Sequence, residues 1–154
     1  MTKTGQERRP ARRRWEKWVP PKFDKQGLTR WNWMCQHPRG LKLGRYVDIG
    51  AFTYINAENG VTIGDYVQVG SHCSLYSVST IDGKAGPVKL GRNCRLGTHT
   101  VVMPGVIVGE NSIVGAFSFV VKDVEENVLA YGVPARTVRP LNREEIRRPR
   151  EETA

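Results

Sequence analysis

The feature that most constrains this chain is an aliphatic residue that returns every six positions between residues 43 and 121. Two insertions, one before Ile63 and one before Leu90, interrupt the repeat without changing its phase afterwards. The repeated positions are Leu43, Ile49, Ile55, Ile63, Val69, Leu75, Leu90, Leu96, Val102, Val108, Val114 and Val120. A helix repeats every 3.6 residues and a strand every two, so a six-residue unit is a short strand plus a tight turn. The pattern therefore predicts a solenoid.

The turns that follow the aliphatic residues show a second periodicity, three units long. One kind of turn recurs as Gly50-Ala51-Phe52, Gly70-Ser71-His72, Gly97-Thr98-His99 and Gly115-Ala116-Phe117. Because every third turn is alike, three units make one triangular coil. We expect four coils, beginning at residues 43, 63, 90 and 108, with residues 77–89 projecting from one coil as a loop.

The third residue of each of these turns has a predictable position. Aliphatic side chains fill the inside of such a prism, and the turn residues point outward. Phe52, His72, His99 and Phe117 should then form a column at one corner, about 4.8 Å apart if ordinary strand spacing holds. The two histidines are thereby predicted to be neighbours on adjacent coils.

The net charge of +9 belongs to the ends of the chain and not to the solenoid. Lys and Arg exceed Asp and Glu by nine in residues 1–42, whereas acidic residues exceed basic ones by two in residues 43–135. Residues 1–14 are expected to be a basic tail that aids solubility, and binding to nucleic acid or another acidic partner is the less favoured alternative.

The location of the protein is expected to be cytoplasmic. Cys73 and Cys94 occupy core positions of the repeat, which suits a reducing compartment. No apolar run reaches transmembrane length, so we expect no membrane association. The arginine-rich start also lacks the apolar segment of a signal peptide.

Three regions follow from these patterns. Residues 1–42 form a basic arm whose four tryptophans cover the first coil, with an aromatic platform for a sugar as the alternative. Residues 43–124 form the solenoid. Residues 125–154 form a C-terminal segment with a short helix that begins after Asn142.

The segment Gly97-Thr98-His99-Thr100-Val101-Val102-Met103-Pro104-Gly105-Val106 resembles the hexapeptide-repeat acyltransferases, in particular their galactoside and maltose acetyltransferase branch. Gly132-Val133-Pro134-Ala135-Arg136 extends the resemblance, which covers roughly residues 43–139. It implies an all-β fold, a left-handed parallel β-helix, which departs from the usual right-handed crossover. It also implies a homotrimer that uses acetyl-CoA at sites between neighbouring chains.

The resemblance assigns one group of residues to acetyl-CoA. The pantetheine arm would lie along Thr98, His99, Gly115 and Ala116. Cations would meet the phosphates of the nucleotide, where Arg binds phosphate through two hydrogen bonds; these are Lys122, Arg136 and Arg139.

The candidate base departs from the galactoside branch. That branch carries its catalytic histidine in the loop after the position of Tyr76, and here the loop has no histidine. His72 on the coil is therefore our candidate general base, because imidazole titrates near neutral pH. Branches that act on nucleotide-linked amino sugars similarly present a histidine from the coil. Asp82 and Tyr76 are expected to hold the acceptor.

The predicted activity is acetyl transfer from acetyl-CoA to a sugar, most favourably to the amino group of a nucleotide-linked amino sugar. A sugar hydroxyl is the alternative acceptor. A zinc carbonic anhydrase is disfavoured, and no metal is expected, because that chemistry needs three histidines and His37 lies outside the repeats. The remaining alternative is a non-catalytic scaffold without affinity for coenzyme A.

Overall fold

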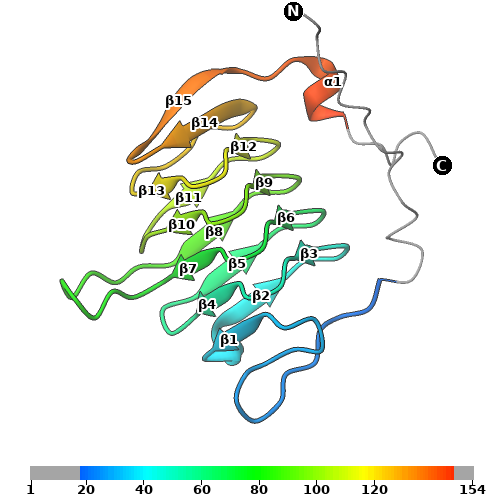
Figure 1. Cartoon of the computed structure of the whole chain (residues 1–154), viewed down its shortest axis with the longest axis vertical. Coiled ribbons are helices and arrows are strands. Elements are labelled where there is room, and N and C mark those ends of the chain that lie inside the picture. Colours follow the sequence, from blue (N-terminus) through cyan, green and yellow to red (C-terminus); the bar gives the residue numbers. More distant parts are fainter. Residues whose placement is uncertain (1–17, 148–154) are drawn as a thin grey trace, which may run out of the picture.

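The chain winds into a left-handed β-helix with three flat faces (Figure 1). The structure is a computed structural model that describes residues 18–147. Its strands are short and rich in valine and isoleucine, which suit a half-buried pleated surface. Neighbouring coils pair in parallel, so each face is a sheet whose strands come from successive coils.

We name the three sheets faces A, B and C. Face A contains β1 (Met34–Gln36), β4 (Tyr54–Asn56), β7 (Ser74–Tyr76), β10 (Val101–Val102) and β13 (Phe119–Val120). Face B contains β2 (Leu41–Leu43), β5 (Val61–Ile63), β8 (Val88–Leu90) and β11 (Ile107–Val108). Face C contains β3 (Asp48–Ile49), β6 (Gln68–Val69), β9 (Arg95–Leu96), β12 (Ile113–Val114), β14 (Val128–Gly132) and β15 (Ala135–Pro140).

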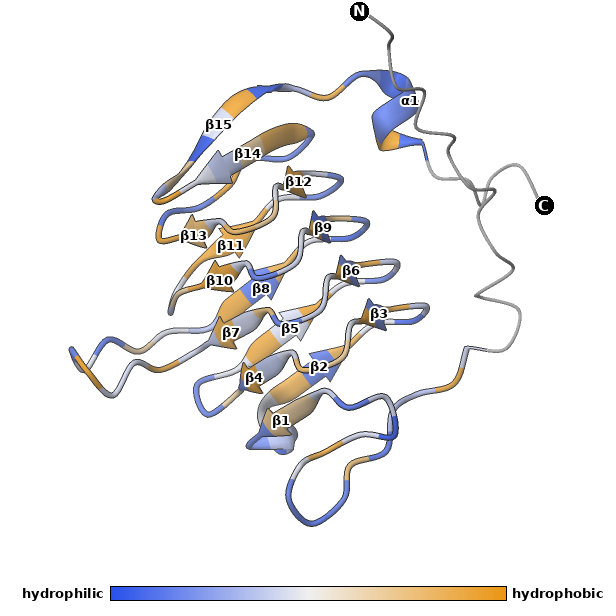
Figure 2. Ribbon diagram, viewed as in Figure 1, coloured by the Kyte–Doolittle hydropathy of each residue, from blue (hydrophilic) through white to orange (hydrophobic). Residues whose placement is uncertain are grey.

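The predicted ladders of aliphatic residues fill the prism. Eleven of the twelve repeat positions are buried, and Leu43 at the lower end packs partly buried against the same core. Cys73 and Cys94 are buried among them as free thiols, which confirms their prediction as core residues. In Figure 2 apolar and polar colouring alternate along many of the strands, as expected where one side chain points into the core and the next points outward.

The solenoid has about five turns, one more than the repeat predicts. β1 pairs in register with β4, and Cys35 takes the buried inward position opposite Ile55. This first turn carries Cys35 where later coils have Val, Ile or Leu. It continues into the 3-10 turn η1 (Pro38–Gly40) instead of a repeat-like turn, so the six-residue pattern does not reveal it.

Glycines at the turns allow neighbouring coils to approach closely. A Cβ added at Gly70 would lie 2.6 Å from the backbone nitrogen of Thr98, and one at Gly97 would lie 2.4 Å from that of Ala116. No side chain fits at such distances, so glycine at these positions fixes the spacing of the coils.

A loop leaves the solenoid between β7 and β8, as predicted (Figure 1). β8 begins at Val88, so the loop ends slightly before the expected residue 89. It is a small hairpin, with a bridge between Val78 and Ala85 and a hydrogen bond from Ser79 N to Lys84 O of 2.7 Å.

The C-terminal segment closes the upper end. β15 returns antiparallel along β14, and the helix α1 (Arg143–Ile146) follows. The predicted helix and its Asn142 cap are confirmed, since the side chains of Asn142 and Glu145 form a reciprocal capping box. Arg95 on face C donates to Glu145 O, and Asn93 Nδ2 donates to Ile146 O (3.2 Å), so α1 is tied to the coils.

The lower end is crossed by residues 18–33. Trp33 is buried in the core with Phe23 packed edge-on against it, and Trp18 Nε1 donates to Val47 O (2.8 Å). The predicted basic tail, with Trp15, lies outside the described residues. Within residues 18–147, neither helix has the length and apolar character that crossing a bilayer requires.

Candidate active site

The corner that joins face C to face A carries a column of aromatic rings. Phe52 and His72 have ring centroids 5.1 Å apart, His72 and His99 4.8 Å, and His99 and Phe117 4.7 Å. The last two pairs are nearly parallel, at 1° and 6°. The predicted column and its spacing are confirmed, and the two imidazoles are neighbours.

All four residues of this column adopt a left-handed backbone conformation, with φ between 57° and 64°. That conformation turns the chain sharply from one face to the next, and asparagine or glycine adopts it more easily than histidine or phenylalanine. The corner between faces B and C shows the easier choice in its upper coils, whereas Tyr46 and Tyr66 occupy it in the two lower ones. In the upper coils Asn93, Asn111 and Asn127 occupy the equivalent positions, and their amides are linked by hydrogen bonds of 2.9 and 2.8 Å.

Hydrogen bonds fix the orientation of one imidazole. Thr98 Oγ1 donates to Ser71 O at 2.8 Å and lies 2.9 Å from His99 Nδ1. A hydroxyl has a single proton and a carbonyl can only accept, so the Thr98 oxygen accepts from His99 Nδ1–H. The neutral imidazole then carries its lone pair on Nε2, where it can accept a proton. Sequence reasoning missed this network, although hydroxyl residues at the same turn position of successive coils were a signal for it.

His72 is held by its neighbours in the column. Its ring lies between those of Phe52 and His99, and its side chain is exposed. Cys73, the next residue, points into the core, where its Sγ–H donates to Gly97 O (3.2 Å). Burial raises the pKa of the Cys73 thiol, so it stays protonated and is no nucleophile.

The structure places the predicted acceptor residues at the other end of β7 from His72. Tyr76 ends β7 and packs against Tyr54, with ring centroids 5.6 Å apart. Asp82 lies in the hairpin and pairs with Lys84 at 3.0 Å. Hydrogen bonds from Ser79 and Lys84 lower the pKa of Asp82 to about 2. Within one chain, the hairpin and the histidine pair are therefore not brought together.

The residues predicted to meet acetyl-CoA fall into two groups. Gly115 and Ala116 lie at the upper end of the corner between faces C and A, which we call the histidine corner. There Tyr131 packs over Gly115. Arg136 follows at the start of β15 and is exposed. These residues share one end of the corner with His99.

Lys122 and Arg139 lie elsewhere. Lys122 is in the turn after β13, at the far edge of face A. Arg139 pairs in the sheet with Leu129 and binds both carboxylate oxygens of Glu145, at 2.9 and 2.7 Å. Bonds from Arg139, and then from the backbone of Asn142, lower the pKa of Glu145 to about 2. The guanidinium of Arg139 is thus already paired.

The three histidines do not converge. His37 lies in the first turn between faces A and B, 4.0 Å from Glu58, whereas His72 and His99 share the opposite end of face A. In the part of the chain that the structure describes, no group of three or more His, Cys, Asp or Glu side chains could hold a metal ion.

Known proteins share this architecture. The family model described as bacterial transferase hexapeptide (six repeats) matches residues 87–122. Galactoside O-acetyltransferase of Escherichia coli strain K12 is 33% identical over 142 residues, which cover 82% of this chain and 68% of that protein.

Two solved structures are also similar. A hexapeptide-repeat acetyltransferase from Vibrio cholerae, complexed with acetyl coenzyme A, is 27% identical with a TM-score of 0.68, covering 71% of this chain and 65% of that one. A galactoside acetyltransferase in complex with coenzyme A is 30% identical with a TM-score of 0.68, covering 83% and 64%. The chain thus spans about two thirds of the length of these proteins. With its coils, its turn pattern and its identity to the galactoside enzyme, the chain belongs to the hexapeptide-repeat acyltransferases.

Proposed function

We propose that the chain transfers an acetyl group from acetyl-CoA to a sugar bound at the histidine corner. The observation that carries this proposal is the stacked pair His72 and His99, exposed on adjacent coils beside a row of small turn residues. The similarity to acetyltransferases, two of them complexed with coenzyme A or its acetyl ester, supports the donor.

In the proposed reaction the acceptor nitrogen or oxygen attacks the thioester carbonyl carbon directly. His72 takes the proton of the acceptor, the C–S bond breaks, and the imidazolium returns the proton to the departing thiolate. The backbone N–H of Ala116 is the proposed donor to the tetrahedral oxyanion. That of Gly115 already donates to Ala130 O at 2.9 Å.

His99 has a specific observation in its favour as an alternative base. Its Nδ1–H is held by Thr98, so its Nε2 lone pair is oriented. We assign His99 to the acetyl-CoA side because it stacks on Phe117, next to Ala116. Single substitutions separate the two assignments.

The acceptor group that we propose first is the amino group of a nucleotide-linked amino sugar. The proposed base, His72, comes from a coil, and its neighbour His99 is oriented by the neutral hydroxyl of Thr98. The hairpin contributes no histidine. An ammonium group can lose its proton to solvent before attack, so it needs less help from a base than a hydroxyl does. A sugar hydroxyl is the second candidate, because the relative at 33% identity is named an O-acetyltransferase.

The proposed assembly is a homotrimer in the cytoplasm. On face A the strand register aligns the outward side chains Met34, Tyr54, Ser74, Val101 and Phe119, of which only Ser74 is not apolar or aromatic, and all are only partly covered within one chain. The equivalent residues of face B include Lys42, Thr62 and Lys89. A mostly apolar row on one face, where another face carries lysines, is typical of a subunit interface. The buried free cysteines suit a reducing compartment.

The test is a turnover assay with the full chain and acetyl-CoA. Acceptors are nucleotide-linked amino sugars, the same amino sugars without nucleotide, and galactosides, and released thiol is followed. We expect turnover with the first group. Mild alkali then distinguishes the products, because it cleaves an O-acetyl ester and leaves an N-acetyl amide intact. Absence of thiol release with every acceptor, together with no calorimetric binding of coenzyme A, would contradict the proposal.

A further inference from the structure

The histidine corner ends, at the first coil, on a tryptophan. The strand register aligns the second residue of this turn in successive coils, and four of the five are small. They are Trp31, Ala51, Ser71, Thr98 and Ala116. Asn32, beside Trp31, has the φ of 62° that the column residues share. The row that passes beside both histidines therefore leads to Trp31.

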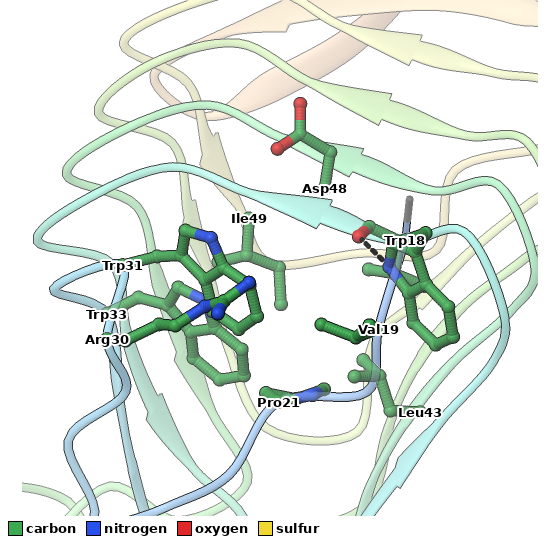
Figure 3. A pocket seen from close by; sticks show the side chains of 10 residues that line it. Trp18, Val19, Pro21, Arg30, Trp31, Trp33, Leu43, Asp48 and Ile49 are labelled. Carbon is green, nitrogen blue, oxygen red and sulfur yellow. Dashed lines mark hydrogen bonds between the residues drawn. The ribbon is translucent and has the colours of Figure 1, made fainter. Parts of the chain in front are cut away.

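Trp31 lies at the tip of a tight turn. Thr29 N donates to Trp33 O (2.9 Å) and Asn32 N donates to Thr29 O (3.0 Å), which leaves Arg30 and Trp31 at the outside. The Arg30 guanidinium carbon is 4.4 Å from the centroid of the Trp31 ring (Figure 3). The turn thus presents an aromatic ring and a cation together.

Two adjoining hollows border this turn. One is about 200 Å³ and is lined by Trp31 together with Trp18, Trp33 and Asp48 (Figure 3). The other is about 440 Å³ and brings in Lys22. Four residues line both: Val19, Pro21, Arg30 and Trp31. We call the two hollows together the Trp31 pocket.

Covering the end of the solenoid does not account for Trp31. Trp33 covers that end, since it is 3% exposed and packs against Phe23. Trp18 donates a hydrogen bond to the backbone of Val47 and contacts Tyr46. Trp31 remains 38% exposed. An exposed ring beside two cations and a hollow has the chemistry of a nucleotide site, in which a base stacks and a phosphate meets guanidinium and ammonium.

We propose that the Trp31 pocket binds the nucleotide end of the acceptor, with the base on Trp31 and the phosphates near Arg30 and Lys22. This inference rests on the proposed function, in which the sugar lies at His72. Trp31 lies two coils below His72 in the register, about 10 Å along the axis. A sugar ring and a diphosphate, laid end to end, cover a comparable distance. Arg30 and Lys22 outnumber Asp48, the one carboxylate among the described lining residues, and therefore favour a nucleotide over an uncharged sugar as the occupant.

The test is calorimetric titration of the full chain with UDP and, separately, dTDP. Excess coenzyme A is present throughout, so that the nucleotide site of the donor is filled. We expect binding that weakens at least about tenfold in Trp31→Leu, because stacking is lost, and in Arg30→Ala, because a phosphate contact is lost. Arg45→Ala is the matched control, since Arg45 stacks on Tyr46 at a different corner. Circular dichroism verifies that the variants fold.

Absence of binding by both nucleotides, or equal dissociation constants for wild type and Trp31→Leu, would overturn the inference. With an active acceptor, Trp31→Leu should raise the KM for that acceptor and leave kcat unchanged. Unchanged kcat/KM would refute the pocket while the acetyl transfer stands. Loss of UDP binding in Trp31→Leu, in a protein that acetylates no acceptor, would support the pocket and refute the transfer.

Discussion

The imidazole rings of His72 and His99 lie parallel, with centroids 4.8 Å apart and planes inclined by 1°. The two residues are separated by a loop and a full coil in the sequence, yet the solenoid makes them neighbours. The two histidines differ in the contacts that hold them. His99 is tied to Thr98 through Nδ1, and His72 is held by ring contacts with Phe52 and His99.

Substitution of each histidine by asparagine should separate their roles. All three histidines have φ between 56° and 58°, a conformation that asparagine tolerates, so folding should be preserved. We expect His72→Asn to lower kcat at saturating acetyl-CoA by about 10²- to 10⁴-fold for a hydroxyl acceptor and less for an amine. His99→Asn should mainly raise the KM for acetyl-CoA. His37→Asn, at another corner, is the control and should leave both parameters unchanged. The reverse pattern would assign the base to His99.

Thr98→Val should remove the preference of the His99 imidazole for the Nδ1–H tautomer. The substitution keeps the shape of the side chain and removes the oxygen that accepts from Nδ1–H. Two-dimensional proton–nitrogen NMR of the imidazoles should show the Nδ1–H form in the wild type and a mixture in the variant. Thr62→Val on the outside of face B is the control. An unchanged spectrum for Thr98→Val would contradict the hydrogen-bond assignment.

Glu145→Gln should remove a pH-dependent contribution to stability. The pKa of Glu145 is lowered to about 2 from an ordinary value of 4.5. A depressed carboxyl pKa stabilises the fold fully above the ordinary value, and the contribution declines as the pH falls from 4.5 toward 2. Urea midpoints should therefore differ between wild type and variant at pH 7 and converge near pH 2. Glu126→Gln, at an exposed carboxylate, is the control, and an equal difference at both pH values would refute this account.

Phe119→Lys should dissociate the proposed trimer. A charge at an outward position of face A would be buried without a partner in an apolar interface. Light scattering should give three times 17.4 kDa for the wild type and the chain mass for the variant. Ile107→Lys places the same charge at an outward, exposed position of face B and should leave the assembly intact. If Ile107→Lys dissociates the assembly and Phe119→Lys does not, the interface lies on face B instead.

The coil architecture and the histidine column were predictable because both depend only on repeat length. A period of six fixes which residues point inward, and strand spacing fixes the distance between coils. The first turn was not predictable in this way. Cys35 replaces the branched aliphatic residue there, and η1 replaces the usual turn, so no periodic signal remains.

Hydrogen-bonded detail at the site was beyond the repeat pattern. The bond from His99 to Thr98 depends on side-chain rotamers, and the pairing of Arg139 with Glu145 depends on the antiparallel return of β15 before α1. Neither is periodic. The prediction that Arg139 meets the nucleotide of acetyl-CoA came from family resemblance alone. That resemblance gave no information that Arg139 pairs with Glu145 of the same chain.

The antiparallel return of β15 has a consequence for self-association. A parallel solenoid exposes at its top an unpaired strand on which another coil, or another molecule, could add indefinitely. β15 occupies that place on face C, runs against the direction of winding, and carries Arg136, Arg139 and Pro140 at the outermost edge of the sheet. Charge and proline at an edge discourage further strand addition. At the top of face C, β15 thereby discourages further molecules from extending the sheet into a fibre.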